Sequence, residues 1–217
     1  MTQTRFPIGL YGVTPEWDDT ARLLDAVRQA AAGGMRALQL RRKQLSRAQR
    51  LAQARELAPL CRELGVVFLV NDDWRTALEA GADGAHLGRD DASLAEVRAA
   101  APGLILGVSC YADLARAREL LAQGADYIAF GAVFPSSTKP QAVRAPLALL
   151  AEAAALARGQ AAPRPAVVAI GGITPANAGQ VAAAGADSIA VITGLFEAPD
   201  IRAAAQACAA PFPSFQA

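Results

Sequence analysis

Short apolar runs recur along the whole chain, and most of them end abruptly in charged, hydroxyl-bearing or glycine residues. Such runs are typical of buried parallel strands, whose polar ends meet at one edge of a sheet. Stretches with the period of an amphipathic helix, such as residues 18–33 and 46–64, lie between the runs. We place eight strand ends near Val13, Leu40, Val70, Leu87, Val108, Ala132, Ile170 and Ile192.

Eight strands alternating with helices predict a (β/α)8 TIM barrel of the α/β class, a small single domain over residues 1–217 with a frayed tail from about residue 210. The segments EAGADGAHLG, AQGADYIAFG and AAGADSIAVI repeat one helix-to-strand turn. Their glycines Gly81, Gly124 and Gly185 are predicted to end helices at the bottom of the barrel. A doubly wound sheet shares the alternation, but the chain has no G-x-G-x-x-G motif, which weakens its dinucleotide-binding version.

The composition argues against several classes of protein. A formal net charge of +1 gives no bulk attraction to nucleic acid or to an anionic membrane. No apolar run approaches the ~20 residues of a membrane span, and the N-terminus does not resemble a secretory signal. The three cysteines are widely spaced, which is typical of reduced thiols and predicts a cytoplasmic protein. The composition leaves open whether the chain assembles into a homo-oligomer.

The second strand predicts an anion site. Gln39 and Arg41 are two residues apart on the strand and point the same way, whereas Leu38 and Leu40 face the helices. Lys43 lies just beyond the strand. A buried Arg needs an anionic partner, and its planar fork suits a phosphate or diphosphate. An internal ion pair between Arg41 and Asp72 or Asp91 is the alternative.

Two carboxylates follow the next two strands. Asp72 lies at the end of the third strand, and Asp91 lies shortly after the fourth. Carboxylates at neighbouring strand ends suit a hard cation such as Mg²⁺, which binds one or two carboxylates together with substrate phosphates. Ordinary loop or helix-start acidity is the alternative for Asp73, Asp90 and Asp91.

Two later loops have the composition of phosphate sites. FPSSTK places hydroxyls and Lys139 directly after the sixth strand. Gly171 and Gly172 follow the seventh strand, and Thr174–Pro175 is predicted to start a helix there. The alternative is a turn that merely needs glycine. The single histidine, His86, is predicted to pack at the fourth strand, and Cys110 to be small and buried.

Read in order, these motifs resemble those of the thiamine phosphate synthases, a family of small (β/α)8 barrels. QLRRK resembles the family's Q-x-R-x-K, VNDD its N-D pair, and GAHLGRDD its H-x-G-x-x-D. GVS, FGAVFPSSTK and AIGGI also match, and the resemblance runs from about Leu10 to Phe196.

The resemblance implies a transferase that joins hydroxymethylpyrimidine diphosphate to thiazole phosphate and releases diphosphate, with Mg²⁺ as cofactor and no side-chain nucleophile. It implies that Asp72 and Asp91 bind Mg²⁺ and that Ser109 contacts the pyrimidine end. Arg41, Lys43, Lys139 and Ser109 would be the catalytic residues. The pyrimidine diphosphate would be held by Gln39, Arg41, Lys43, Asn71 and Lys139, and the thiazole phosphate by Ser136, Thr138, Gly172, Ile192 and Thr193.

Three positions depart from the family pattern. Arg89 stands where Gln is usual, Ser136 where Thr is usual, and Thr193 where Ser is usual. Two other functions stay open: a thiazole-phosphate tautomerase of the same fold, and a catalytically silent ligand-binding module. The tautomerase needs no diphosphate clamp, so Arg41, Lys43 and the two aspartates favour the synthase.

Overall fold

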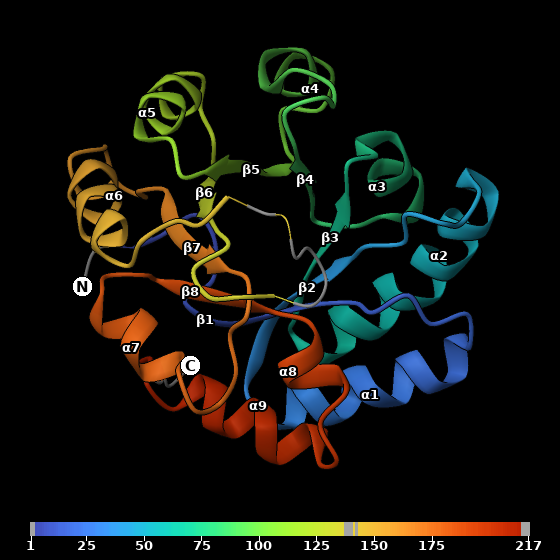
Figure 1. Ribbon diagram of the computed structural model, residues 1–217. Helices are drawn as coiled ribbons and strands as arrows, with labels where there is room; N and C mark the ends of the chain where they lie inside the picture. Colours follow the sequence, from blue (N-terminus) through green and yellow to red (C-terminus); the bar gives the residue numbers. More distant parts are fainter. Residues whose placement is uncertain (1–2, 137–140, 142, 214–217) are drawn as a thin grey trace.

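The computed structural model describes residues 3–136, 141 and 143–213. Eight parallel strands close into a barrel in chain order, with β8 hydrogen-bonded to β1 (Figure 1). This confirms the predicted fold, and it puts the C-terminal ends of all strands on one rim. The strands are β1 (Gly9–Val13), β2 (Met35–Leu40), β3 (Val67–Asn71), β4 (Gly84–Leu87), β5 (Ile105–Tyr111), β6 (Tyr127–Phe130), β7 (Ala166–Ile170) and β8 (Ser188–Val191).

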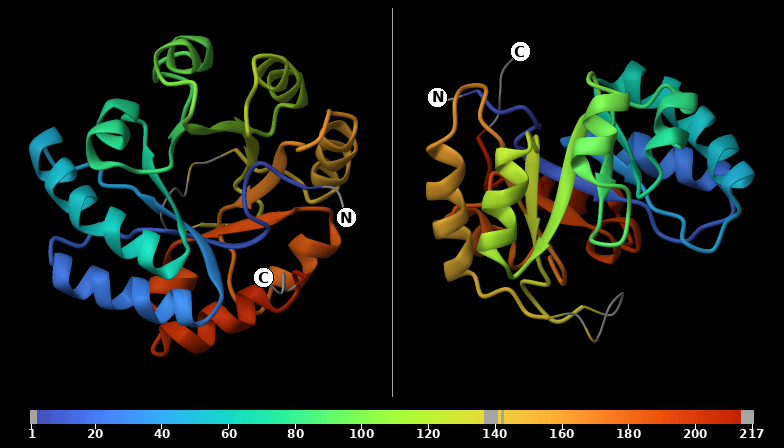
Figure 2. Two further views of the ribbon diagram at one scale, coloured as in Figure 1. Left: turned by 180° about the vertical axis from the view of Figure 1, so that it is seen from behind. Right: turned by 90° about the horizontal axis from the view of Figure 1, so that it is seen from above.

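Helices surround the barrel. In Figure 2 (right) the yellow residues 131–136 after β6 lie at one end of the barrel and the blue N-terminal segment at the other. The final helix packs against the first and so closes the outer ring. The helices are α1 (Thr20–Ala32), α2 (Arg47–Leu64), α3 (Trp74–Ala80), α4 (Leu94–Ala100), α5 (Leu114–Ala122), α6 (Ala148–Arg158), α7 (Ala178–Ala183), α8 (Thr193–Phe196) and α9 (Ile201–Ala209).

The repeated helix-to-strand turn has a structural function. Gly81, Gly124 and Gly185 all adopt positive φ angles, as the sequence predicts for helix ends. The aspartate two residues later in each repeat accepts a hydrogen bond from a backbone N–H of the preceding strand. The bonds are Phe68 N to Asp83 (2.7 Å), Leu106 N to Asp126 (2.8 Å) and Val167 N to Asp187 (2.8 Å). The repeat therefore ties neighbouring strands together at the bottom of the barrel.

The barrel interior is apolar at the bottom and polar above. Phe6, Tyr11 and Tyr127 fill the lower interior, and the rings of Phe6 and Tyr127 lie 4.2 Å apart. Leu38 and Leu40 belong instead to the larger core under the helices, as predicted from their alternation with Gln39. The pleat of each strand thus separates the packing core from the residues that face the barrel axis.

The prediction of a frayed tail is wrong for its first part. The apolar ring of Phe212 is buried in the core under the helices. This packing continues past the end of α9 at Ala209. Residues 214–217 of the tail lie outside the described residues. No helix within the described residues is long and apolar enough to cross a membrane.

Gly107 makes room for Tyr127, and we expect its substitution to destabilise the barrel. A Cβ at Gly107 would lie 1.8 Å from the Cζ atom of the buried Tyr127. Gly107→Ala should lower the free energy of unfolding in urea by about 2–3 kcal/mol through overpacking. Gly103→Ala is the matched control, because no atom lies within 4 Å of its Cβ position. Equal losses in both variants would contradict this account.

Candidate active site

A cavity of about 1030 Å³ opens at the C-terminal ends of the strands, and every strand contributes to its lining. Its volume is at the upper end of the range typical of small-molecule sites. The cavity brings together all the predicted site residues that the structure describes. They are Gln39, Arg41, Lys43, Asn71, Asp72, Asp91, Ser109, Ser136, Gly172, Ile192 and Thr193. Thr138 and Lys139 lie outside the described residues.

The cations after β2 have counter-charges from two neighbouring loops. Arg41 Nη1 lies 3.6 Å from Glu16 Oε1, and the same oxygen accepts a hydrogen bond of 3.0 Å from the backbone N–H of Lys43. Lys43 Nζ lies 3.7 Å from Asp72 Oδ2. The alternative interpretation of the sequence paired Arg41 with Asp72 or Asp91. The structure instead pairs Arg41 with Glu16, from the loop after β1. Nothing in the spacing of the sequence singles out Glu16.

Arg42, between the two cavity-facing cations, is turned away from the cavity and buried. Its guanidinium donates to the backbone carbonyl of Trp17, to Gln53 Oε1 at 3.1 Å, and to Asp18 Oδ1 at 2.6 Å. It also lies 3.3 Å from Glu16 Oε2. Arg42 therefore fastens the loop after β1, including Glu16, to the segment that carries Arg41 and Lys43.

The carboxylates of Asp72 and Asp91 lie close enough to influence each other. Burial raises the pKa of Asp72, and hydrogen bonding and like charge from Asp91 raise it further, whereas Lys43 and Arg41 lower it. Asp72 adopts a left-handed backbone conformation (φ 64°), which Asp tolerates better than most residues and which is common at functional sites. Asp73 instead caps α3 by accepting from Thr76 N, so the explanation as helix-start acidity holds for Asp73.

These two carboxylates fit a metal that also binds substrate. Like-charged carboxylates are stabilised when a divalent cation lies between them. No group of three or more His, Cys, Asp or Glu side chains suited to a metal exists among residues 3–136, 141 and 143–213. A site with two carboxylates suits Mg²⁺, which usually takes its remaining ligands from phosphate oxygens and water.

His86 is buried on β4, as predicted, and it also lines the cavity. Its Nε2 atom lies 2.8 Å from Ser109 Oγ, and its Nδ1 atom lies 2.8 Å from the Tyr127 hydroxyl. Tyr11 and Tyr127 are interior residues that the sequence reasoning missed; the alternation in GLYGV and YIAF is the signal that could have found them. Cys110 is buried as predicted, and burial raises the pKa of its thiol to about 12.

The two predicted phosphate loops pack against each other. Phe134 N donates to Gly171 O at 3.0 Å, and a Cβ at Gly172 (φ 64°) would lie 2.2 Å from the carbonyl oxygen of Pro135. This close approach requires glycine, as the alternative of a turn that needs glycine predicts. The same residue also lines the cavity, so both interpretations of Gly172 hold. The predicted helix start at Thr174–Pro175 is wrong: α7 begins at Ala178, and residues 174–177 form a turn in which Asn177 N donates to Thr174 O and Thr174 N donates to the Asn177 side chain.

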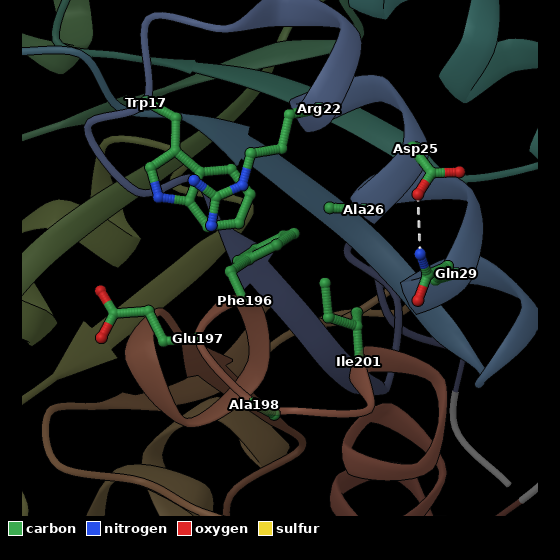
Figure 3. Close-up of a pocket in the computed structure, with 9 residues that line it drawn as sticks. All are labelled: Trp17, Arg22, Asp25, Ala26, Gln29, Phe196, Glu197, Ala198 and Ile201. Carbon is green, nitrogen blue, oxygen red and sulfur yellow. Dashed lines mark hydrogen bonds between the residues drawn. The ribbon is translucent and has the colours of Figure 1, made fainter.

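A second, smaller cavity of about 240 Å³ lies outside the barrel, between α1 and the α8–α9 region (Figure 3). The guanidinium of Arg22 lies 3.6 Å from the centre of the Trp17 ring, which packs edge-on against Phe196. The arginine is already engaged with this ring. The larger cavity, with its converging cations, carboxylates and glycines, is therefore the candidate active site.

Comparisons with known proteins show the family to which the chain is similar. The family model for thiamine monophosphate synthase matches residues 10–195. A thiamine-phosphate synthase from Bordetella avium is 87% identical over 98% of this chain and 99% of the relative. One from Thiobacillus denitrificans is 56% identical over 92% of each chain. The structure of thiamine phosphate pyrophosphorylase from Pyrococcus furiosus matches with a TM-score of 0.79 and 34% identity, over 94% of this chain and 95% of that chain.

Replacing Arg42 should destabilise the fold. Arg42→Met leaves Gln53 Oε1 without its donor and the Trp17 carbonyl with only a 3.5 Å contact to Gln53 Nε2, which we expect to lower the free energy of unfolding by about 2–3 kcal/mol. Asp18 adds little, because its side chain is 89% exposed and returns to water. Arg28→Met, at an exposed position of α1, is the control for chemical denaturation. A loss no larger than in this control would exclude the proposed fastening of the two loops.

Proposed function

The chain belongs to the thiamine monophosphate synthase family, and we propose that it couples hydroxymethylpyrimidine diphosphate with thiazole phosphate to give thiamine phosphate and diphosphate. This proposal rests on one observation: two sides of the same cavity carry different chemical groups. Cations and carboxylates after β2, β3 and β4 face it, and so do glycines and hydroxyls after β6, β7 and β8. A reaction between a diphosphate ester and a second phosphorylated heterocycle needs both sides.

The β2–β4 side suits the pyrimidine diphosphate. We assign its diphosphate to Arg41, Lys43, Asn71 and Lys139, and its ring to Gln39 and Ser109. Arg41 and Lys43 support this assignment because both line the cavity and lie against carboxylates that an incoming anion can replace. Lys139 is assigned from the family motif alone.

Asp72 and Asp91 are assigned to a divalent metal, and Mg²⁺ is the metal we propose. Their mutual effect on the Asp72 pKa supports the assignment, since a cation would relieve it. Bound there, Mg²⁺ would supply positive charge to the leaving diphosphate.

The β6–β8 side suits the thiazole phosphate. Ser136 and Thr138 would donate hydroxyls to the phosphate, and the backbone of Gly172 would approach it closely. Ile192 and Thr193 would complete this pocket. The contact between the loops after β6 and β7 supports the assignment, because it brings Ser136 and Gly172 to one part of the cavity.

The bond changes then need no nucleophilic side chain. The carbon–oxygen bond of the pyrimidine substrate breaks, the diphosphate leaves with the electron pair, and the aminopyrimidine stabilises the resulting cation. The thiazole nitrogen then donates its electron pair to that carbon and forms the new bond. Arg41, Lys43 and Lys139 would neutralise the departing charge, and the cavity walls would hold the two rings together and exclude water. The high thiol pKa of Cys110 agrees with the absence of a covalent step through this residue.

The direct test mixes the purified chain with both substrates and Mg²⁺. We expect thiamine phosphate and diphosphate in equal amounts. Isomerisation of the thiazole phosphate without coupling would instead support the tautomerase, and binding of both ligands without any product would support the silent module.

Asp72→Ala should reduce coupling by about 100-fold or more, because a metal clamp contributes several kcal/mol to stabilising the transition state. Its stability should change little, because the loss of a carboxylate whose pKa is raised by folding offsets the cost of placing alanine in the left-handed conformation of residue 72. Asp90→Ala, at an exposed neighbour that also lines the cavity, is the control and should retain turnover within about threefold. Mg²⁺ titrations of turnover and thermal unfolding measure both effects. Near-normal, metal-dependent turnover of Asp72→Ala would reject the assignment.

Lys43→Ala should raise the KM for the pyrimidine diphosphate about tenfold and leave the KM for the thiazole phosphate unchanged, because a charged hydrogen bond contributes about 1.5–3 kcal/mol. Lys43→Arg keeps the positive charge and should lose less. Steady-state kinetics with each substrate varied in turn measures the difference. Equal losses for both substrates would place Lys43 outside the diphosphate clamp.

A further inference from the structure

A chain of side-chain hydrogen bonds crosses the barrel interior beneath the cavity. The amide nitrogen of Gln39 donates to the Tyr11 hydroxyl, which lies 2.9 Å from the Tyr127 hydroxyl. Tyr127 lies 2.8 Å from His86 Nδ1, and His86 Nε2 lies 2.8 Å from Ser109 Oγ. The five residues come from five strands, and the chain joins the two residues assigned above to the pyrimidine ring, Gln39 and Ser109.

The direction of this chain follows from its first bond. An amide nitrogen donates and does not accept, and each hydroxyl has one proton. Tyr11 accepts from Gln39, and Tyr127 is the remaining partner in this chain for the Tyr11 proton, so we assign Tyr11 as donor to Tyr127 and Tyr127 as donor to Nδ1 of His86. His86 is left with its proton on Nε2, where it donates to Ser109 Oγ. Ser109 then keeps its hydroxyl proton for an acceptor in the cavity.

The interior holds this arrangement rigidly. Tyr11 and Tyr127 are buried, and burial raises the pKa of both phenols, so each hydroxyl keeps the proton that the chain requires. Gly107 provides the space for the Tyr127 ring. The backbone carbonyl of Ser109 accepts from Arg116 Nε at 2.9 Å, which fixes its main chain and leaves mainly the hydroxyl to be oriented.

We propose that His86 is a positioning residue that, as the Nε2–H tautomer, fixes Ser109 as a hydrogen-bond donor to a lone-pair nitrogen of the pyrimidine substrate. This inference rests on the proposed function, because Ser109 is assigned to the pyrimidine there. Ring nitrogens of an aminopyrimidine accept hydrogen bonds. A neutral hydroxyl orients such a ring without adding positive charge to it, and added charge would oppose formation of the carbocation.

The tautomer can be read directly, because His86 is the only histidine of the chain. Untagged protein labelled with ¹⁵N-histidine should give one imidazole, protonated at Nε2 and with an accepting Nδ1, in long-range ¹H–¹⁵N spectra. Tyr127→Phe should shift the Nδ1 resonance toward that of an unbonded nitrogen. An Nδ1–H tautomer or an imidazolium in the unmodified chain would overturn the proposed direction.

Kinetics tests whether the arrangement serves the substrate. His86→Leu removes the donor to Ser109, whereas the amide of His86→Gln can reach the position of Nε2 and restore it. We expect His86→Leu to raise the KM for the pyrimidine diphosphate about tenfold, with the KM for thiazole phosphate unchanged, and His86→Gln to recover most of the loss. Equal losses in both variants and for both substrates would reject the positioning role. The NMR result needs no substrate, so an Nδ1–H tautomer refutes this inference, whereas absence of thiamine phosphate from the coupling assay refutes the proposed function.

Discussion

The register of the closed parallel barrel is the constraint on which the site depends. A strand that is hydrogen-bonded on both sides presents alternate side chains to the helices and to the axis, and a shift of one residue would exchange the two sets. In β2 that alternation buries Leu38 and Leu40 under the helices and leaves Gln39 on the axis. The pairing of β3 with β4 sets Asn71 beside His86, so cavity residues far apart in sequence are brought together by the backbone alone.

The interior changes in character from bottom to top, and this gradient separates stability from chemistry. Aromatic rings pack the bottom, where apolar burial stabilises the barrel. Phenol and imidazole groups follow, each hydrogen-bonded, because an unpaired polar group at that depth would cost about 1–3 kcal/mol. The charged side chains that line the cavity among the described residues all follow the C-terminal ends of strands, where solvent and ligands can reach them. Tyr127 belongs to both regions: its ring packs on Phe6 and its hydroxyl joins the polar chain.

Sequence reasoning succeeded where a residue's function depends on local periodicity and failed where it depends on a distant partner. The alternation in β2 was sufficient to orient Gln39 and Arg41 correctly. Glu16 could not be found in this way, because it meets Arg41 only through the path of the loop after β1. Tyr11 and Tyr127 are 116 residues apart, so their hydrogen bond follows from barrel closure rather than from any motif. The start of α7 was misplaced by a few residues, because Thr174 and Pro175 begin a turn in which Asn177 N donates to Thr174 O, and the helix itself follows at Ala178.

Glu16 and Asp72 compensate the positive charges that gather at a polyanion-binding site. Cations gathered for a diphosphate repel one another, and the chain must fold before that ligand binds. Here the cavity-facing cations Arg41 and Lys43 each have a carboxylate within 4 Å, so their charges are compensated internally. These contacts are longer than hydrogen-bonded ion pairs, at 3.6 and 3.7 Å, whereas the buried Arg42 donates to the buried Gln53 Oε1 at 3.1 Å. The structural arginine is therefore held tightly and the two cavity cations loosely, and a phosphate oxygen can displace a loose partner at low cost.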